Sequence, residues 1–112
     1  WWARVHHQKY VLPIEALFAI PNGGARDVIT GARLKAEGVR PGIPDLMLAQ
    51  PIAPYAGLFI EMKAGNGKLS ASQEAVRQNL TRAGYLVVAA WQSEVAIAHI
   101  EKYLPLVLPE RE

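Results

Sequence analysis

A run of seven consecutive apolar residues, Tyr-Leu-Val-Val-Ala-Ala-Trp at 85–91, constrains the fold of this chain more than any other segment. The run is too short to span a membrane as a helix and is rich in residues that favour strands, so it predicts a β-strand. Successive side chains of a strand point to opposite faces, so an apolar residue at every position requires cover on both faces. We therefore expect a central strand in a sheet that has helices on both sides.

The rest of the chain alternates between strand-like and helix-like patterns. Strands are predicted at residues 17–20, 45–49 and 58–63. Helices are predicted at residues 1–7, 27–37, 71–83 and 93–104. The first of these strands should be buried, and the next two should pair as an antiparallel hairpin with a long connection. The order α-β-α-β-β-α-β-α specifies an α/β fold in which helices flank a mixed β-sheet.

Length and composition indicate one domain over residues 1–112. Hydrophobic residues make up 51% of the 112, which is enough for a core, and no apolar run is long enough to cross a membrane. The absence of cysteine excludes disulfides, thiolate metal sites and thiol nucleophiles. The chain begins without methionine inside an expected helix, so we expect that part of the natural N-terminus is missing, and that residues 105–112 form a poorly ordered tail.

Three charged residues stand where apolar strands begin or end. Asp45 follows Gly42-Ile43-Pro44 and opens one predicted strand, whereas Glu61 and Lys63 close the next. Alternation places Glu61 and Lys63 on one face, and pairing of the two strands can bring Asp45 beside Glu61. Adjacent carboxylates repel each other, and Mg²⁺ or Mn²⁺ are ions that carboxylates select. The pattern predicts metal-dependent phosphodiester hydrolysis, in which Lys63 orients the attacking water or stabilises the phosphorus centre.

Each of these features also has a simpler explanation. Charged residues at strand ends are commonly solvated or weakly ion-paired. Ser70-Ala71-Ser72-Gln73 matches a capping box, although the same helix start would lie beside Lys63, where Gln73 could orient a water or a phosphate instead. We expect one rotamer of Gln73 to fill only one of these two roles. Trp91 is interpreted as a core or interface anchor rather than as a platform for base stacking.

The middle of the chain is moderately basic. Between Arg26 and Arg82 there are eight basic and five acidic residues. Two of the acidic residues are the proposed metal ligands. This balance is compatible with binding to a DNA backbone. Candidate contacts with DNA are Asn22, Arg40, Lys68 and Arg77. The simpler interpretation of Asn22 is a place in a tight turn, and that of the three basic residues is exposure to solvent without a partner.

Six blocks occur in a recognisable order between residues 17 and 104: Ile20-Pro21-Asn22-Gly23-Gly24, Leu34-Lys35-Ala36-Glu37-Gly38, Gly42-Ile43-Pro44-Asp45-Leu46, Gly57-Leu58-Phe59-Ile60-Glu61-Met62-Lys63, Gly67-Lys68-Leu69-Ser70 with Gln73, and Ala83-Gly84-Tyr85. In this order they resemble the virus-type replication-repair nuclease (VRR-NUC) family. The resemblance implies a restriction-endonuclease-like fold of the PD-(D/E)xK type and metal-dependent cleavage of DNA.

The resemblance also implies roles for individual residues. Asp45 and Glu61 would be metal ligands together with the backbone carbonyl of Met62, Lys63 the catalytic lysine and Gln73 an active-site glutamine. A further glutamate is implied on the first helix, upstream of the Trp1-Trp2-Ala3-Arg4 segment, at a position that precedes the first residue of this sequence. Small stand-alone members resemble phage proteins that act as homodimers on branched DNA, in the manner of Holliday-junction resolvases of DNA repair.

Three hypotheses follow for the function of the chain. The first is a Mg²⁺- or Mn²⁺-dependent DNA endonuclease, selective for branched DNA, dimeric, and located in the cytoplasm of a bacterial or phage-infected host cell. The second is a DNA-binding module that keeps the nuclease fold without the reaction. The third is a small structural α/β domain whose charged strand ends are ion-paired and inert.

Overall fold

The computed structural model describes residues 16–21 and 36–104 of the chain. These contain four strands, β1 (Leu17–Ala19), β2 (Leu46–Leu48), β3 (Leu58–Met62) and β4 (Leu86–Ala90), and two helices, α3 (Ala71–Arg82) and α4 (Ser93–Tyr103). Each element lies within a segment that the sequence predicts. The expected helices at residues 1–7 and 27–37 and the expected tail at 105–112 lie outside the described residues, apart from Ala36 and Glu37.

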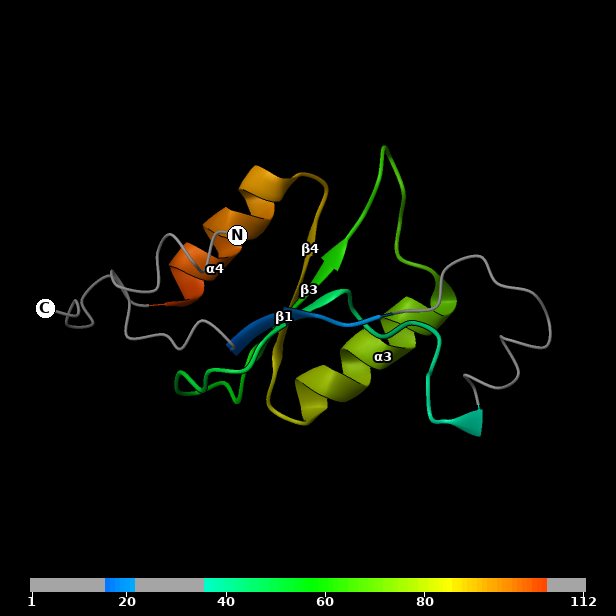
Figure 1. Ribbon diagram of the computed structural model, residues 1–112, viewed down its shortest axis with the longest axis horizontal. Coiled ribbons are helices and arrows are strands. Elements are labelled where there is room, and N and C mark those ends of the chain that lie inside the picture. The colour runs from blue at the N-terminus through cyan, green and yellow to red at the C-terminus, as the bar shows by residue number, and fades with distance from the viewer. Residues whose placement is uncertain (1–15, 22–35, 105–112) are drawn as a thin grey trace, which may run out of the picture.

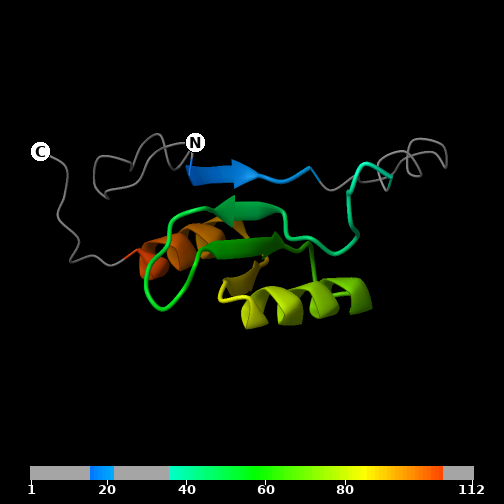
Figure 2. The ribbon, with the colours of Figure 1, turned by 90° about the horizontal axis from the view of Figure 1, so that it is seen from below.

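The four described strands form one mixed sheet in the order β1-β2-β3-β4, and Figure 2 shows them stacked in this order. β1 pairs with β2 and β2 with β3 in antiparallel fashion, with Leu46 opposite Ile60 in the second pair. The predicted hairpin of the second and third strands is therefore confirmed. β4 pairs with β3 in parallel, as the crossover through α3 allows, with Met62 opposite Ala90.

The two helices cover opposite sides of the sheet (Figure 1). α4 packs on the side where Leu58 and Ile60 are fully buried, and there Ala96, Ile100 and Tyr103 of the helix join the core. Tyr103 also ties this helix to the loop after β2, because its hydroxyl donates to the Gln50 carbonyl at 2.7 Å. α3 lies on the other side, which is the side of Phe59 and Glu61. The α3 side of β3 is therefore the side that carries the charged residues.

Two sequence-based predictions about the sheet are wrong. β1 is not buried, since Leu17 is half-buried and the Phe18 side chain is 43% exposed. β4 is not central, because it lies at the edge of the sheet formed by the described strands. The apolar run of β4 is instead explained by its contacts with helices on both faces, α3 on one and α4 on the other. Cover by helices and a central position are separate properties, and the sequence pattern reports only the first.

The ends of the helices follow local sequence signals. α3 is followed by Gly84, which adopts a positive φ of 101° that other residues rarely adopt. The Tyr85 N–H donates back to the Leu80 carbonyl at 3.0 Å and closes this end. Among the described residues, no helix has the length and apolar character needed to cross a membrane.

Candidate active site

Glu61 is the charged side chain that the fold buries within residues 16–21 and 36–104, with only 6% of its surface exposed. Burial of a carboxylate is costly unless the charge is neutralised or compensated. Desolvation, followed by a side-chain hydrogen bond with Asp45 and the charge of Asp45, raises the pKa of Glu61 from 4.5 to about 7, while Lys63 acts in the opposite direction. The two carboxyl groups thus lie together, as the strand pairing predicts.

The hairpin fixes Asp45 at the start of β2. Its backbone N–H donates to the Ile60 carbonyl at 3.1 Å, so the pairing of β2 and β3 continues to this residue. Its side-chain Oδ2 accepts the backbone N–H of Met62 at 2.8 Å. The carboxylate is therefore held across the end of β3, next to the residue that follows Glu61.

Gln73, in the first turn of α3, connects the other two site residues. Its Nε2 donates to Glu61 Oε1 at 3.0 Å, and its Oε1 accepts from Lys63 Nζ at 3.1 Å. A donor facing the carboxylate and an acceptor facing the ammonium fix the orientation of the amide. Asp45, Glu61, Gln73 and Lys63 consequently form one continuous polar cluster.

The same Gln73 side chain also caps α3. Its Oε1 accepts the Ser70 N–H at 2.8 Å, while the Ser70 hydroxyl accepts the Gln73 N–H at 3.2 Å, which completes the capping box. One rotamer of Gln73 therefore caps α3 and contacts Glu61 and Lys63 at the same time, whereas its role in orienting a water or a phosphate stays a prediction. One carbonyl oxygen has two lone pairs, and here one serves the helix and the other Lys63.

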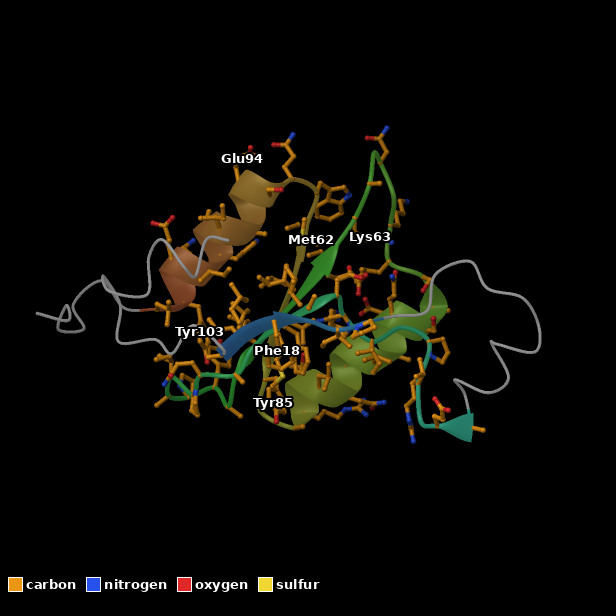
Figure 3. All side chains as sticks on the ribbon, in the orientation of Figure 1. Phe18, Met62, Lys63, Tyr85, Glu94 and Tyr103 are labelled. Carbon is orange, nitrogen blue, oxygen red and sulfur yellow. The ribbon has the colours of Figure 1, made fainter. Side chains whose placement is uncertain are left out.

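Lys63 lies on the α3 side of the sheet just beyond β3. Figure 3 shows Met62 and Lys63 on opposite sides of the end of this strand, with Lys63 on the side of α3. The Lys63 N–H donates to the Ala90 carbonyl at 2.8 Å, so the lysine is anchored to the end of β4. Its side chain passes over Gly67, where an added Cβ would lie 3.4 Å from Lys63 Cε.

Gly42 holds the segment before β2 against the start of α3. It has a positive φ of 86°, and an added Cβ would lie 2.5 Å from the Ser72 carbonyl oxygen and 2.9 Å from the Gln73 nitrogen. This backbone contact places the approach to Asp45 directly on the helix turn that carries Gln73. The sequence gives no sign of this contact, since nothing near Gly42 in the chain indicates the partner thirty residues away.

Three of the four candidate DNA contacts lie among the described residues. Arg40 and Lys68 are exposed, and Asn22 lies outside the described residues. Arg77 lines a cavity beside Glu61 and Gln73, and its Nε donates to Glu74 at 3.1 Å. Among the described residues no three His, Asp or Glu side chains gather as a metal site, so any ion here would rely on Asp45, Glu61 and other oxygen donors.

Replacing Glu61 with glutamine should stabilise the metal-free protein at pH 8 and have little effect near pH 4.5. The folded state raises the pKa of Glu61 from 4.5 to about 7, so ionisation penalises folding increasingly across this interval and fully above it. The penalty is about 1–3 kcal/mol, and the amide does not carry it. Thermal unfolding in a chelator at both pH values measures the difference. Equal melting temperatures of the two proteins at pH 8 would contradict this electrostatic account.

Replacing Gln73 with alanine should lower both stability and any activity of the site. The variant loses one half of the cap and the links to Glu61 and Lys63, so we expect about 1 kcal/mol less unfolding free energy. The matched control is Ser70→Ala, which removes the other half of the cap and contacts neither Glu61 nor Lys63. If catalytic rates fall equally in the two variants, Gln73 acts only as a helix cap.

Comparisons with known proteins bear on the family and the fold of the chain. A family model described as the VRR-NUC domain matches residues 3–93. A solved structure titled "VRR_NUC domain protein" superposes with a TM-score of 0.70 at 28% identity, covering 85% of this chain and 72% of that one. No curated protein matches this chain. The mixed sheet between helices is thus consistent with a restriction-endonuclease-like α/β fold.

Proposed function

The chain belongs to the VRR-NUC domain family, and we propose that this nuclease-type domain is a metal-dependent DNA endonuclease with Asp45, Glu61, Lys63 and Gln73 as its active site. The observation that carries the proposal is the burial of Glu61 against Asp45 within a cluster that also holds Lys63. A purely structural role would not favour a second carboxyl group, that of the half-buried Asp45, beside the buried Glu61. Their repulsion calls for a cation, and carboxylate oxygens suit Mg²⁺ or Mn²⁺.

Asp45 and Glu61 would hold the metal, with the backbone carbonyl of Met62 as a third oxygen. The N–H and C=O of one strand residue face the same neighbouring strand. Since the Met62 N–H donates to Asp45 Oδ2, its carbonyl faces the Asp45 side as well. A bound divalent cation would supply Lewis-acid activation of water and compensation of negative charge on the phosphodiester.

Lys63 would act on the phosphate or on the attacking water. Its ammonium has three donors, and Gln73 Oε1 accepts from it at 3.1 Å, which leaves donors to turn toward a substrate oxygen. Gln73 holds this ammonium and the Glu61 carboxylate at a fixed separation through the two ends of one amide. The Lys63 ammonium is thereby held in a fixed orientation, in which it would stabilise the negative charge that develops on the phosphate in the transition state.

The proposal extends to branched DNA as substrate and to a homodimer as the active form. A four-way junction presents two related strands, and a two-fold dimer presents two matching sites. The exposed Arg40 and Lys68 would contact the DNA backbone. One domain over residues 1–112 would carry all of these functions.

A cleavage panel tests the proposal. A four-way junction, a flap, a splayed arm and plain duplex are incubated with the protein in Mg²⁺, Mn²⁺ or chelator, and the products are resolved on denaturing gels. We expect cuts in the branched substrates only when a metal is present. Binding to the junction with no product in either metal would identify a DNA-binding module instead and contradict the proposal.

A further inference from the structure

Trp91 is an exposed aromatic residue at the end of β4. Trp91 is 46% exposed, so of the two interpretations, core anchor or interface anchor, the first is wrong and the second is not tested. An exposed tryptophan leaves a large apolar surface in water, and such surfaces commonly mark binding sites. Val95, in the first turn of α4, is another large hydrophobic residue that is partly exposed, at 38%.

The sheet places Trp91 next to the candidate active site. β3 and β4 run in parallel with Met62 opposite Ala90, and the Lys63 N–H donates to the Ala90 carbonyl. Lys63 directly follows β3 and Trp91 directly follows β4. The two residues are therefore neighbours at the same end of the paired strands. Strand neighbours lie about 5 Å apart between backbones, which is within the reach of one nucleotide.

The indole is held in a fixed orientation by its polar atom. Trp91 Nε1 donates to the Gly67 carbonyl at 3.0 Å, and Gly67 is the residue over which the Lys63 side chain passes. Because Nε1 is the sole hydrogen-bond donor of the indole and is bonded to the Gly67 carbonyl, the remainder of the ring system is an apolar π surface. Gly67, in the loop between β3 and α3, therefore lies close to both the Trp91 indole and the Lys63 side chain.

We propose that Trp91 is a stacking platform for one unpaired nucleobase of the substrate, adjacent to the phosphate that faces Lys63. The inference depends on the proposed nuclease function and specifies a feature of its substrate. A base inside a duplex has no free face, whereas a base at a branch point or in a flap can leave the stack and cover an indole. The exposed Lys68 on the same loop suits the backbone of that nucleotide.

The role of the ring can be separated from the role of its hydrogen bond. Trp91→Phe and Trp91→Leu both lose the bond to Gly67, but only phenylalanine keeps an aromatic face. We expect the leucine variant to lose about tenfold or more in kcat/KM on a flap or splayed arm, and the phenylalanine variant to stay within about threefold of wild type. Neither variant should differ from the other on fully paired duplex.

Substrates with a single abasic position identify the stacked base. Wild-type protein should lose about tenfold in cleavage at one unpaired position when its base is removed, and the leucine variant should lose nothing further there. The same substrates are also measured by binding in chelator, which reports on stacking when no cleavage occurs. A base-dependent binding difference without cleavage would support the platform and contradict the nuclease.

Two results would overturn the inference while leaving the nuclease intact. One is equal kcat/KM on unpaired substrates for the leucine, phenylalanine and wild-type proteins. The other is a change of oligomeric state in Trp91→Leu by sedimentation, which would assign this surface to contact between copies of the chain.

Discussion

Lys63→Ala should reduce metal-dependent cleavage of branched DNA by about 10³-fold while leaving the fold and metal binding intact. The ammonium is the cation that the cluster directs toward the substrate, and it supplies none of the oxygen ligands that a metal needs. Its loss leaves Gln73 Oε1 with its second partner, the Ser70 N–H, so the helix cap survives. Single-turnover cleavage in Mn²⁺ measures the rate, and circular dichroism checks the fold.

The matched control for this prediction is Lys102→Ala. Lys102 lies in the last turn of α4, the helix on the opposite face of the sheet, and its removal changes the net charge by the same amount. Unchanged cleavage by the Lys102 variant together with loss in the Lys63 variant would show that position, rather than overall charge, matters. Rates within a few fold of wild type for Lys63→Ala would remove Lys63 from the active site.

Gly42→Ala should lower the free energy of unfolding by about 2–4 kcal/mol and impair cleavage in the protein that remains folded. The new Cβ would lie 2.5 Å from the Ser72 carbonyl oxygen, and backbone on both sides must move to relieve the contact. The movement separates the segment leading to Asp45 from the turn that carries Gln73. Chemical denaturation and cleavage at a temperature well below unfolding measure the two effects.

The control variant Gly84→Ala distinguishes the effect of the close contact at Gly42 from the effect of a positive φ. Gly84 has a similarly positive φ of 101°, but an added Cβ would meet nothing within 4 Å. We expect this variant to lose about 1–2 kcal/mol from the left-handed conformation alone and to keep its activity. If the two variants prove equally stable and equally active, the approach of Gly42 to α3 has no role in the site.

The parts of the fold that depend on neighbouring residues could be predicted from the sequence. Hydrophobic runs indicated all four described strands, and the helix predicted at residues 71–83 ends where Gly84 supplies the left-handed residue that a helix end favours. The position of β4 at the sheet edge could not be predicted in this way. An apolar run reports that both faces are covered, and it contains no information on which strands lie alongside.

The proximity of the charged residues of the candidate site could also be predicted, because it depends on strand geometry and on the pairing of two successive strands. Strand alternation places Glu61 and Lys63 on one face, and the hairpin brings Asp45 to them. The link that Gln73 makes with Lys63 could not be predicted. A capping box is recognised by the spacing of Ser70 and Gln73, whereas the second lone pair of the Gln73 amide oxygen accepts from Lys63, a residue outside the helix. The contact of Gly42 with Ser72 and the exposure of Trp91 likewise arise only from tertiary packing.

The central claim is that Asp45 and Glu61 share one divalent cation, and calorimetric titration of Mn²⁺ into the protein tests it most directly. Wild type and Lys63→Ala should bind Mn²⁺ with similar affinity, whereas Asp45→Asn and Glu61→Gln should each lose measurable binding, because each removes a charged oxygen ligand. Unaltered Mn²⁺ affinity in both carboxylate variants, with their folds intact, would contradict the account.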